Sequence, residues 1–164
     1  MVSIHHLCHH PEHLPQVAAW IHGAFWTRSG QGVEAVVGLL RAADDPDRIP
    51  LSLLARIGTA TAGTVNLIAC DSKARPDLTP WLAALFVEPE HRGKGIGAAL
   101  VRRLVTEAAR LGCTEMFLET DIPEFYARLG ATRYQPLADG GWIMRIAVRR
   151  LEGIGLGDSS HNGD

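Results

Sequence analysis

The stretch Arg92-Gly93-Lys94-Gly95-Ile96-Gly97 separates an apolar run from a long amphipathic segment. The run before it, Pro80 to Val87, is almost wholly apolar, which is typical of a strand buried on both faces. After it, from Gly95 to about Leu111, apolar residues recur at helical spacing and charged residues cover the opposite side. The stretch therefore predicts a glycine-rich turn that joins a strand to a helix.

Such a turn can bind a phosphate group. Glycines at alternate positions permit positive φ angles and leave backbone N–H groups accessible to a ligand. The first turn of a helix adds unpaired N–H donors and a partial positive charge, so an anion is its natural occupant. Arg92 and Lys94 place two cations beside it. The alternative, a glycine turn that only begins a helix, is disfavoured because glycine destabilises a helix start unless a ligand compensates.

Two familiar glycine motifs do not fit. The phosphate loop of kinase-type nucleotide-binding proteins needs GxxxxGK followed by Ser or Thr. Here Glu88 occupies the position of its first glycine and Gly95 that of its hydroxyl. The dinucleotide motif GxGxxG follows the first strand of its domain, but Leu100 replaces its third glycine and three or four strands precede it. A nicotinamide-dependent oxidoreductase is therefore disfavoured.

The rest of the chain alternates between the periodicities of strands and helices. The order predicts a mixed α/β fold: a mostly antiparallel central sheet of about six to seven strands with helices on both faces. Residues 1–150 form one domain in this interpretation, and 151–164 form a flexible tail. The predicted strands are 2–7, 51–57, 62–70, 80–87, 115–120, 132–136 and 142–148, and the helices begin at Pro11, Val33, Gly95 and Pro123.

Composition narrows the class of protein. With 164 residues, 46% apolar and 21% charged, the chain is long enough for one globular domain. The net charge of −2 gives no basic surface for nucleic acid or an anionic membrane, and no apolar run is long enough to span a bilayer. The N-terminus lacks the pattern of a secretory signal. Three cysteines without metal-site spacing read as core residues in a reducing compartment, so we expect a cytoplasmic protein.

Histidines gather near the N-terminus, at positions 5, 6, 9, 10 and 13. A metal site across His9 and His13 would need a helical turn, but Pro11 lies between them and disfavours one. We therefore interpret these side chains as solvated polar groups and expect no metal.

The residues around the turn closely resemble the GNAT superfamily of N-acetyltransferases. The family signature, Gln/Arg-x-x-Gly-x-Gly/Ala between the fourth strand and the third helix, matches Arg92 to Gly97 fully. A second family element, with a tyrosine shortly before a glycine, matches Phe125-Tyr126-x-x-Leu129-Gly130. The likeness covers about residues 50–148. It implies an acyl-CoA N-acyltransferase fold whose fourth and fifth strands splay apart, with acetyl-CoA as co-substrate.

The resemblance also assigns residues to the donor. The pantetheine arm would pair with Leu85, Phe86 and Val87, where a backbone N–H would polarise the thioester carbonyl. The pyrophosphate would lie on Arg92, Gly93, Lys94, Gly95, Ile96, Gly97 and Ala98. Tyr126 would protonate the leaving thiolate as a general acid. Many members carry an asparagine before this tyrosine, but here Thr120-Asp121-Ile122-Pro123 takes its place.

The acceptor half is less determined. No carboxylate lies in Trp81 to Val87, so Asp71 and Glu119, at two other strand ends, are the candidate general bases. Phe25 and Trp26 could line an amine pocket, where an aromatic face would attract an ammonium group. The leading hypothesis is acetyl transfer to a primary amine of a small molecule by direct attack. A protein or peptide acetyltransferase and a CoA-binding module without turnover remain alternatives, and a homodimer is possible.

Overall fold

The computed structural model describes residues 1–149 and contains one seven-stranded sheet of order β1-β2-β3-β4-β5-β7-β6. All neighbouring strands are antiparallel except β4 and β5, which are parallel. The mixed, mostly antiparallel sheet expected from the sequence is therefore confirmed. Its strands are β1 (Val2–His6), β2 (Leu51–Ile57), β3 (Ala60–Ile68), β4 (Trp81–Val87), β5 (Glu115–Thr120), β6 (Thr132–Pro136) and β7 (Trp142–Ala147).

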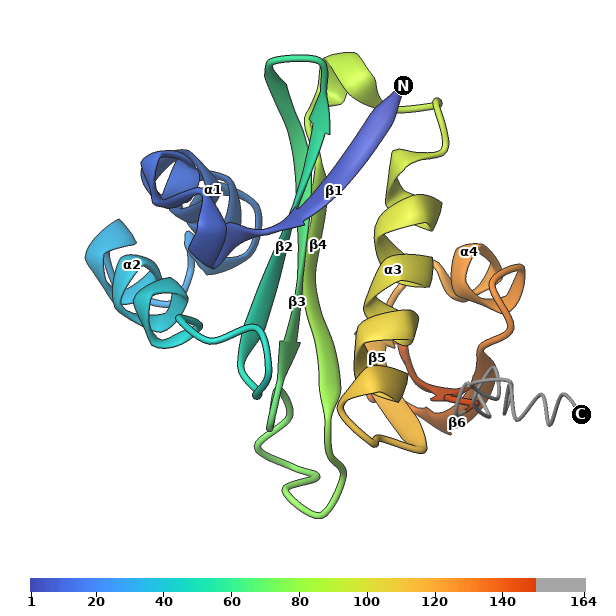
Figure 1. Cartoon of the computed structure of the whole chain (residues 1–164). Helices are drawn as coiled ribbons and strands as arrows, with labels where there is room; N and C mark the ends of the chain where they lie inside the picture. Colours follow the sequence, from blue (N-terminus) through green and yellow to red (C-terminus); the bar gives the residue numbers. More distant parts are fainter. Residues whose placement is uncertain (150–164) are drawn as a thin grey trace, which may run out of the picture.

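Helices cover the sheet on both faces (Figure 1). On one face, α1 (Leu14–Ile21) and α2 (Val33–Ala42) enclose an apolar cluster against Leu54 of β2. On the other face, α3 (Ile96–Arg110) packs over β2, β3 and β4, with α4 (Pro123–Ala127) beside it. The core therefore consists of two apolar layers separated by the sheet.

The N-terminal helical region is more broken than its periodicity predicts. Instead of one helix that starts at Pro11, two short 3-10 helices, η1 (Leu7–His9) and η2 (Pro11–His13), precede α1. A π-helical turn, η3 (His22–Trp26), follows α1. A π turn adds one residue per turn and shifts the side chains after it around the helix axis, and such turns occur frequently at functional sites. The expected tail, 151–164, lies outside the described residues.

The strands β4 and β5 diverge. They share one register pair, Trp81 with Phe117, and from there toward Val87 the described strands form no further β4–β5 ladder. The first two residues of β4 are buried, whereas Ala83 to Val87 are only half-buried. The expectation of a strand buried on both faces was thus wrong for this half, because β5 leaves its edge open.

A β-bulge interrupts β4 at the same place. The register with β3 shifts between Thr64 and Asn66, and Ala84 has a φ of 52°. A positive φ in a residue with a Cβ costs free energy, and bulges often re-aim a strand next to a site. Asn66 donates its side-chain N–H to the carbonyl of Ala83 (3.3 Å) and accepts a hydrogen bond from the Ser52 hydroxyl (2.6 Å). These buried side chains satisfy a backbone group beside the bulge.

A buried carboxylate ties α3 to the edge of the sheet. Glu107 on α3 accepts hydrogen bonds from Arg103 (3.1 Å) and Arg110 (2.6 Å), and it lies 3.1 Å from His6 Nε2 on β1. Burial by itself raises the pKa of Glu107, but the hydrogen bonds from Arg110 and Arg103 outweigh burial and hold the pKa below its ordinary value.

In residues 1–149, every helix is too short or too polar to cross a membrane.

Candidate functional site

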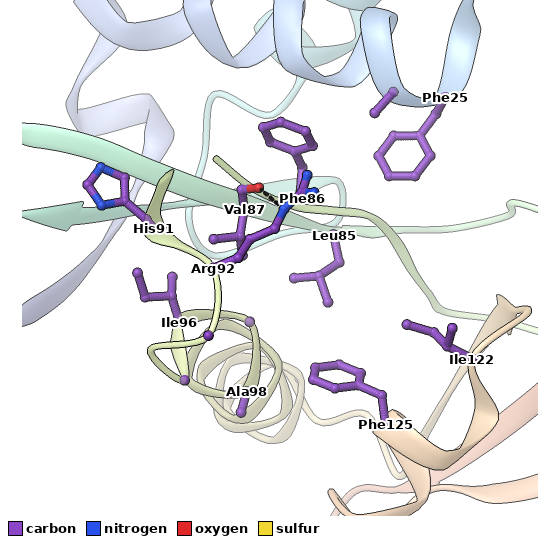
Figure 2. A pocket seen from close by; sticks show the side chains of 14 residues that line it. Phe25, Leu85, Phe86, Val87, His91, Arg92, Ile96, Ala98, Ile122 and Phe125 are labelled. Carbon is purple, nitrogen blue, oxygen red and sulfur yellow. Dashed lines mark hydrogen bonds between the residues drawn. The ribbon is translucent and has the colours of Figure 1, made fainter. Parts of the chain in front are cut away.

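A pocket of about 530 Å³ opens where β4 and β5 diverge. Figure 2 shows the second half of β4 along one wall, the start of α3 below it, and side chains from η3 and α4 across the opening. The lining residues are Ala24, Phe25, Leu85, Phe86, Val87, His91, Arg92, Gly93, Gly95, Ile96, Gly97, Ala98, Ile122 and Phe125. The structure thus brings the predicted donor residues together around one cavity, with the exception of Lys94, which is exposed outside its lining.

One end of the pocket is formed by the glycine turn. Gly95 precedes the first residue of α3 with a φ of 79°, and Gly93 has a φ of 77°. A Cβ at Gly95 would touch nothing within 4 Å, so it is the backbone angle that requires glycine there. Among the described residues, no side chain caps the start of α3. The first N–H groups of α3 are therefore available to an anion.

Arg92 is engaged with β4 on the same side of the turn. Its Nε donates a hydrogen bond to the carbonyl oxygen of Val87 (2.8 Å), and its guanidinium carbon lies 5.6 Å from the centre of the Phe86 ring. These contacts fold the side chain back along β4, as Figure 2 shows. Arg92 therefore braces the turn against the strand as well as adding positive charge to the pocket.

The other end of the pocket is apolar. Phe25 from η3 is 53% exposed and Ile122, between β5 and α4, is 54% exposed. Leu85 and Phe125 continue the apolar lining from there, and the Phe125 ring reaches the glycine turn, where it would lie 3.5 Å from a Cβ placed on Gly97. Of the two aromatic residues predicted to bind the amine, Phe25 lines this pocket, whereas Trp26 packs against the apolar cluster under α1 and α2.

A comparison with protein families agrees with this arrangement. The profile of the acetyltransferase (GNAT) family matches residues 10–131, which include β4, the glycine turn and α4. The chain belongs to the GNAT family of acetyltransferases. Acetyl-CoA is the co-substrate of this family, and the pocket combines an uncapped helix start with an open strand edge.

Solved GNAT structures have the same fold at low sequence identity. The aminoglycoside 6'-N-acetyltransferase from Enterococcus faecium is 18% identical, with a TM-score of 0.65 over 91% of this chain and 97% of the other. A putative acetyltransferase of Salmonella typhimurium, YncA, with acetyl-CoA, is 18% identical with a TM-score of 0.68 over 91% and 95%. The PaiA N-acetyltransferase of Thermoplasma acidophilum with coenzyme A is 19% identical, with a TM-score of 0.67 over 90% and 99%.

Tyr126 of this GNAT chain lies beside the pocket, behind Phe125. Its side chain belongs to the apolar cluster under α3, is only 6% exposed, and is not among the residues that line the pocket. The rings of Phe125 and Tyr126 pack edge to face with their centres 4.9 Å apart. Burial, together with the negative charge of Asp121, raises the pKa of Tyr126 to about 12.

The two candidate bases come together on the sheet face opposite α3. Glu119 pairs with Ile143 and is two residues from Phe117, so it shares their face of the sheet, where both pack with Trp81. The pKa of Asp71 is raised by desolvation of its carboxyl and by the nearby charge of Glu119. Both residues are exposed, and neither lines the pocket.

Some site residues of this GNAT protein escaped the sequence interpretation. The sequence assigns no ligand contact to Ile122 or Phe125, although both line the pocket. Glu88 follows β4 and accepts a hydrogen bond from the indole N–H of Trp20 on α1, whose ring packs on Phe86 at 5.4 Å between centres. The exposed hydrophobic residue before Pro123 was the available signal for Ile122, whereas no local pattern links Trp20 to Glu88.

Residues 1–149 contain no group of three His, Cys, Asp or Glu side chains placed to hold a metal ion. The N-terminal histidines nevertheless contact one another, with the rings of His5 and His10 4.9 Å apart and those of His6 and His9 5.8 Å apart. They lie on β1, η1 and η2, away from the pocket lining.

Proposed function

We propose that this protein transfers the acetyl group of acetyl-CoA to a primary amine of a small molecule by direct attack through a tetrahedral intermediate. The observation that carries the proposal is the shape of the pocket at the β4–β5 divergence, which joins an uncapped helix start to an open strand edge. An elongated ligand with phosphates at one end and amide groups along its arm fits both features.

The donor half of the proposal follows from the backbone. The pyrophosphate accepts hydrogen bonds from the N–H groups that follow Gly95, and Arg92 and Lys94 supply positive charge. The amides of the pantetheine arm pair with the edge of β4 from Leu85 to Val87, where β5 provides no ladder partner in the described chain. A backbone N–H of this edge then stabilises the oxyanion of the tetrahedral intermediate.

Tyr126 is proposed to donate to the leaving sulfur. With a pKa of about 12 its hydroxyl is protonated at neutral pH, which is the state that a donor needs. A pKa so far above that of an ordinary thiol, about 8.5, makes complete proton transfer uphill. Its contribution is therefore a hydrogen bond that stabilises the thiolate as the C–S bond breaks, and the proton that neutralises the thiolate comes from the acceptor amine or from water.

Asp71 and Glu119 are proposed to take up, through water, the proton that an acceptor ammonium loses before attack; the second proton, lost from the same nitrogen after attack, is the one that can neutralise the thiolate. The raised pKa of Asp71 makes that carboxylate more basic than an ordinary aspartate, which is the direction a general base requires. Their exposure allows the proton to pass on to solvent. A small molecule is favoured as acceptor because enzymes with this fold include aminoglycoside 6'-acetyltransferases.

Two measurements test the proposal. Saturating acetyl-CoA should raise the melting temperature of the purified protein, as expected for a ligand that binds only the folded state, whereas NADH should leave it unchanged. An unchanged melting temperature with acetyl-CoA would contradict the donor site. Thiol release in the presence of a panel of amines and peptides then separates a small-molecule enzyme from a peptide acetyltransferase, and no release with any acceptor would indicate a binding module.

A further inference from the structure

The two ends of the pocket differ in chemistry. The end at the glycine turn carries the positive charge of Arg92 and the open N–H groups of α3. The opposite end consists of Ala24, Phe25 and Ile122, with Leu85 and Phe125 as apolar lining between the two ends, and no aspartate or glutamate is among the residues that line the pocket. Figure 2 shows the Phe25 ring and the Ile122 side chain both to the right of Leu85, with Phe25 above and Ile122 below. None of the residues that line this end therefore carries a negative charge that would pair with a cationic ligand.

We propose that the acceptor is a primary amine on an apolar body, aromatic or branched aliphatic, which packs between Phe25 and Ile122. The inference rests on the proposed acetyl transfer and names its acceptor class. Phe25 and Ile122 are the specificity-determining residues. Both are large hydrophobic side chains that are more than half exposed in the free protein, and an apolar ligand that covers them removes that surface from water.

The place of Phe25 in the fold indicates that the acceptor binds at this apolar end of the pocket. The donor is held by backbone groups of β4 and by the start of α3, which belong to the central sheet and to one of its faces. Phe25 instead comes from η3, in the helical layer on the opposite face, beside Ala24. The π-helical turn of η3 is what presents the ring, while the next residue, Trp26, packs inward. An acceptor that approaches from the face of α1 and α2 meets Phe25 before it reaches β4.

An apolar wall also favours the chemistry. Only the neutral form of an amine is a nucleophile, and alkylammonium groups of lysine type have an ordinary pKa of about 10.4. Removal of an ammonium group from water lowers its pKa, because desolvation disfavours the charged form. A wall without carboxylates therefore helps to release the proton before attack. A polycationic acceptor, in contrast, would carry several charges against a wall whose lining residues include no carboxylate.

The test compares acceptors and variants by thiol release at saturating acetyl-CoA. The acceptors are 2-phenylethylamine, isoamylamine, ethanolamine and the aminoglycoside kanamycin. We expect kcat/KM for the first two to exceed that for ethanolamine and kanamycin by about tenfold or more, which corresponds to about 1.4 kcal/mol. F25A should raise KM for 2-phenylethylamine about tenfold and leave KM for acetyl-CoA within about twofold, and F25L should restore most of the loss.

The matched control is L39A, because Leu39 on α2 is also a large exposed hydrophobic residue, at 57%, but lies outside the pocket lining. It should change neither KM. If F25A raises KM for acetyl-CoA and not for the amine, the ring contacts the pantetheine arm and the inference is wrong. Release with kanamycin but not with 2-phenylethylamine overturns the acceptor class alone and leaves the acetyltransferase proposal intact. Stabilisation by acetyl-CoA without release from any amine overturns both.

Discussion

Replacement of Gly95 by alanine separates the backbone requirement of the turn from its role in ligand binding. The residue has a φ of 79°, and an added Cβ would meet nothing within 4 Å. Steric contact therefore contributes nothing, and the cost is the left-handed conformation, about 1–2 kcal/mol. Alanine also reduces the entropy of the unfolded chain, which returns about 0.4–1 kcal/mol. We expect a net loss of about 1 kcal/mol in the free energy of unfolding.

For a chain of 164 residues, this loss corresponds to a fall in melting temperature of about 3 °C. The chain can relieve the strain by rotation of residue 95, but that rotation turns the first N–H groups of α3 away from the phosphates. Because a hydrogen bond to a charged group contributes about 1.5–3 kcal/mol, loss of one lowers CoA affinity about tenfold or more. Isothermal titration with CoA and a thermal melt measure both effects.

Gly140 provides the matched control for G95A. It has a φ of 94° and equally free space around its Cβ, but it lies in the turn between β6 and β7. G140A should lower the melting temperature by a similar amount and leave CoA affinity unchanged. Equal CoA affinity in the two variants would refute the assignment of the phosphate site to the start of α3.

Three further predictions concern the core, the strand edge and the leaving group. E107Q should lower the free energy of unfolding by about 2 kcal/mol at neutral pH, because Arg103 and Arg110 lose a charged acceptor but stay partly hydrated. The pKa of Glu107 in the folded protein lies below its ordinary value of 4.5. The carboxylate therefore contributes its full stabilisation above pH 4.5 and loses it as the pH falls through the folded pKa. Below pH 4.5, the free energy of unfolding measured in urea should consequently change less with pH in E107Q than in the unchanged protein. G63A places a Cβ 2.6 Å from the Phe86 carbonyl oxygen, so the free energy of unfolding should fall by about 1–3 kcal/mol and CoA should bind more weakly. An unchanged melting temperature would show that β4 can move away from the added Cβ at no cost. Y126F should lower kcat about tenfold or more while CoA affinity stays within twofold, and equal turnover would remove Tyr126 from the mechanism.

Much of the architecture was predictable because each element carries its own periodicity. The bounds of β2, β5 and β6 agree with the sequence interpretation to the residue, since turn residues such as Gly58, Gly112 and Gly130 lie close to their ends. The boundary of β3 was displaced by two residues, because Ala60 and Thr61 continue the pairing with β2 although their composition is typical of a turn. Local composition does not record where a neighbouring strand supplies hydrogen bonds.

The site was predictable where glycine is needed for its backbone and less so where long-range packing decides. Gly95 can be recognised from the sequence because glycine is the residue that most readily adopts the positive φ of this turn. The bulge in β4 is at Ala84, and alanine normally avoids positive φ, so the apolar run from Pro80 to Val87 gives no sequence signal for the bulge. Phe25 and Trp26 were equivalent candidates until the π-helical turn directed one to the pocket and the other to the core.

The single β4–β5 register pair can act as a hinge between the two halves of the sheet. The hinge is well packed, because the rings of Trp81 and Phe117 have centres 5.9 Å apart and the Trp81 indole N–H donates to the Leu78 carbonyl at 2.7 Å. Beyond this pair, the part of β4 that does not pair with β5 extends six residues, or about 20 Å. A rotation of about 3° at the hinge therefore changes the separation of the two strands at Val87 by about 1 Å. Substitutions at Trp81 or Phe117, remote from any ligand atom, should thus set how tightly the two halves of the sheet grip what lies between them.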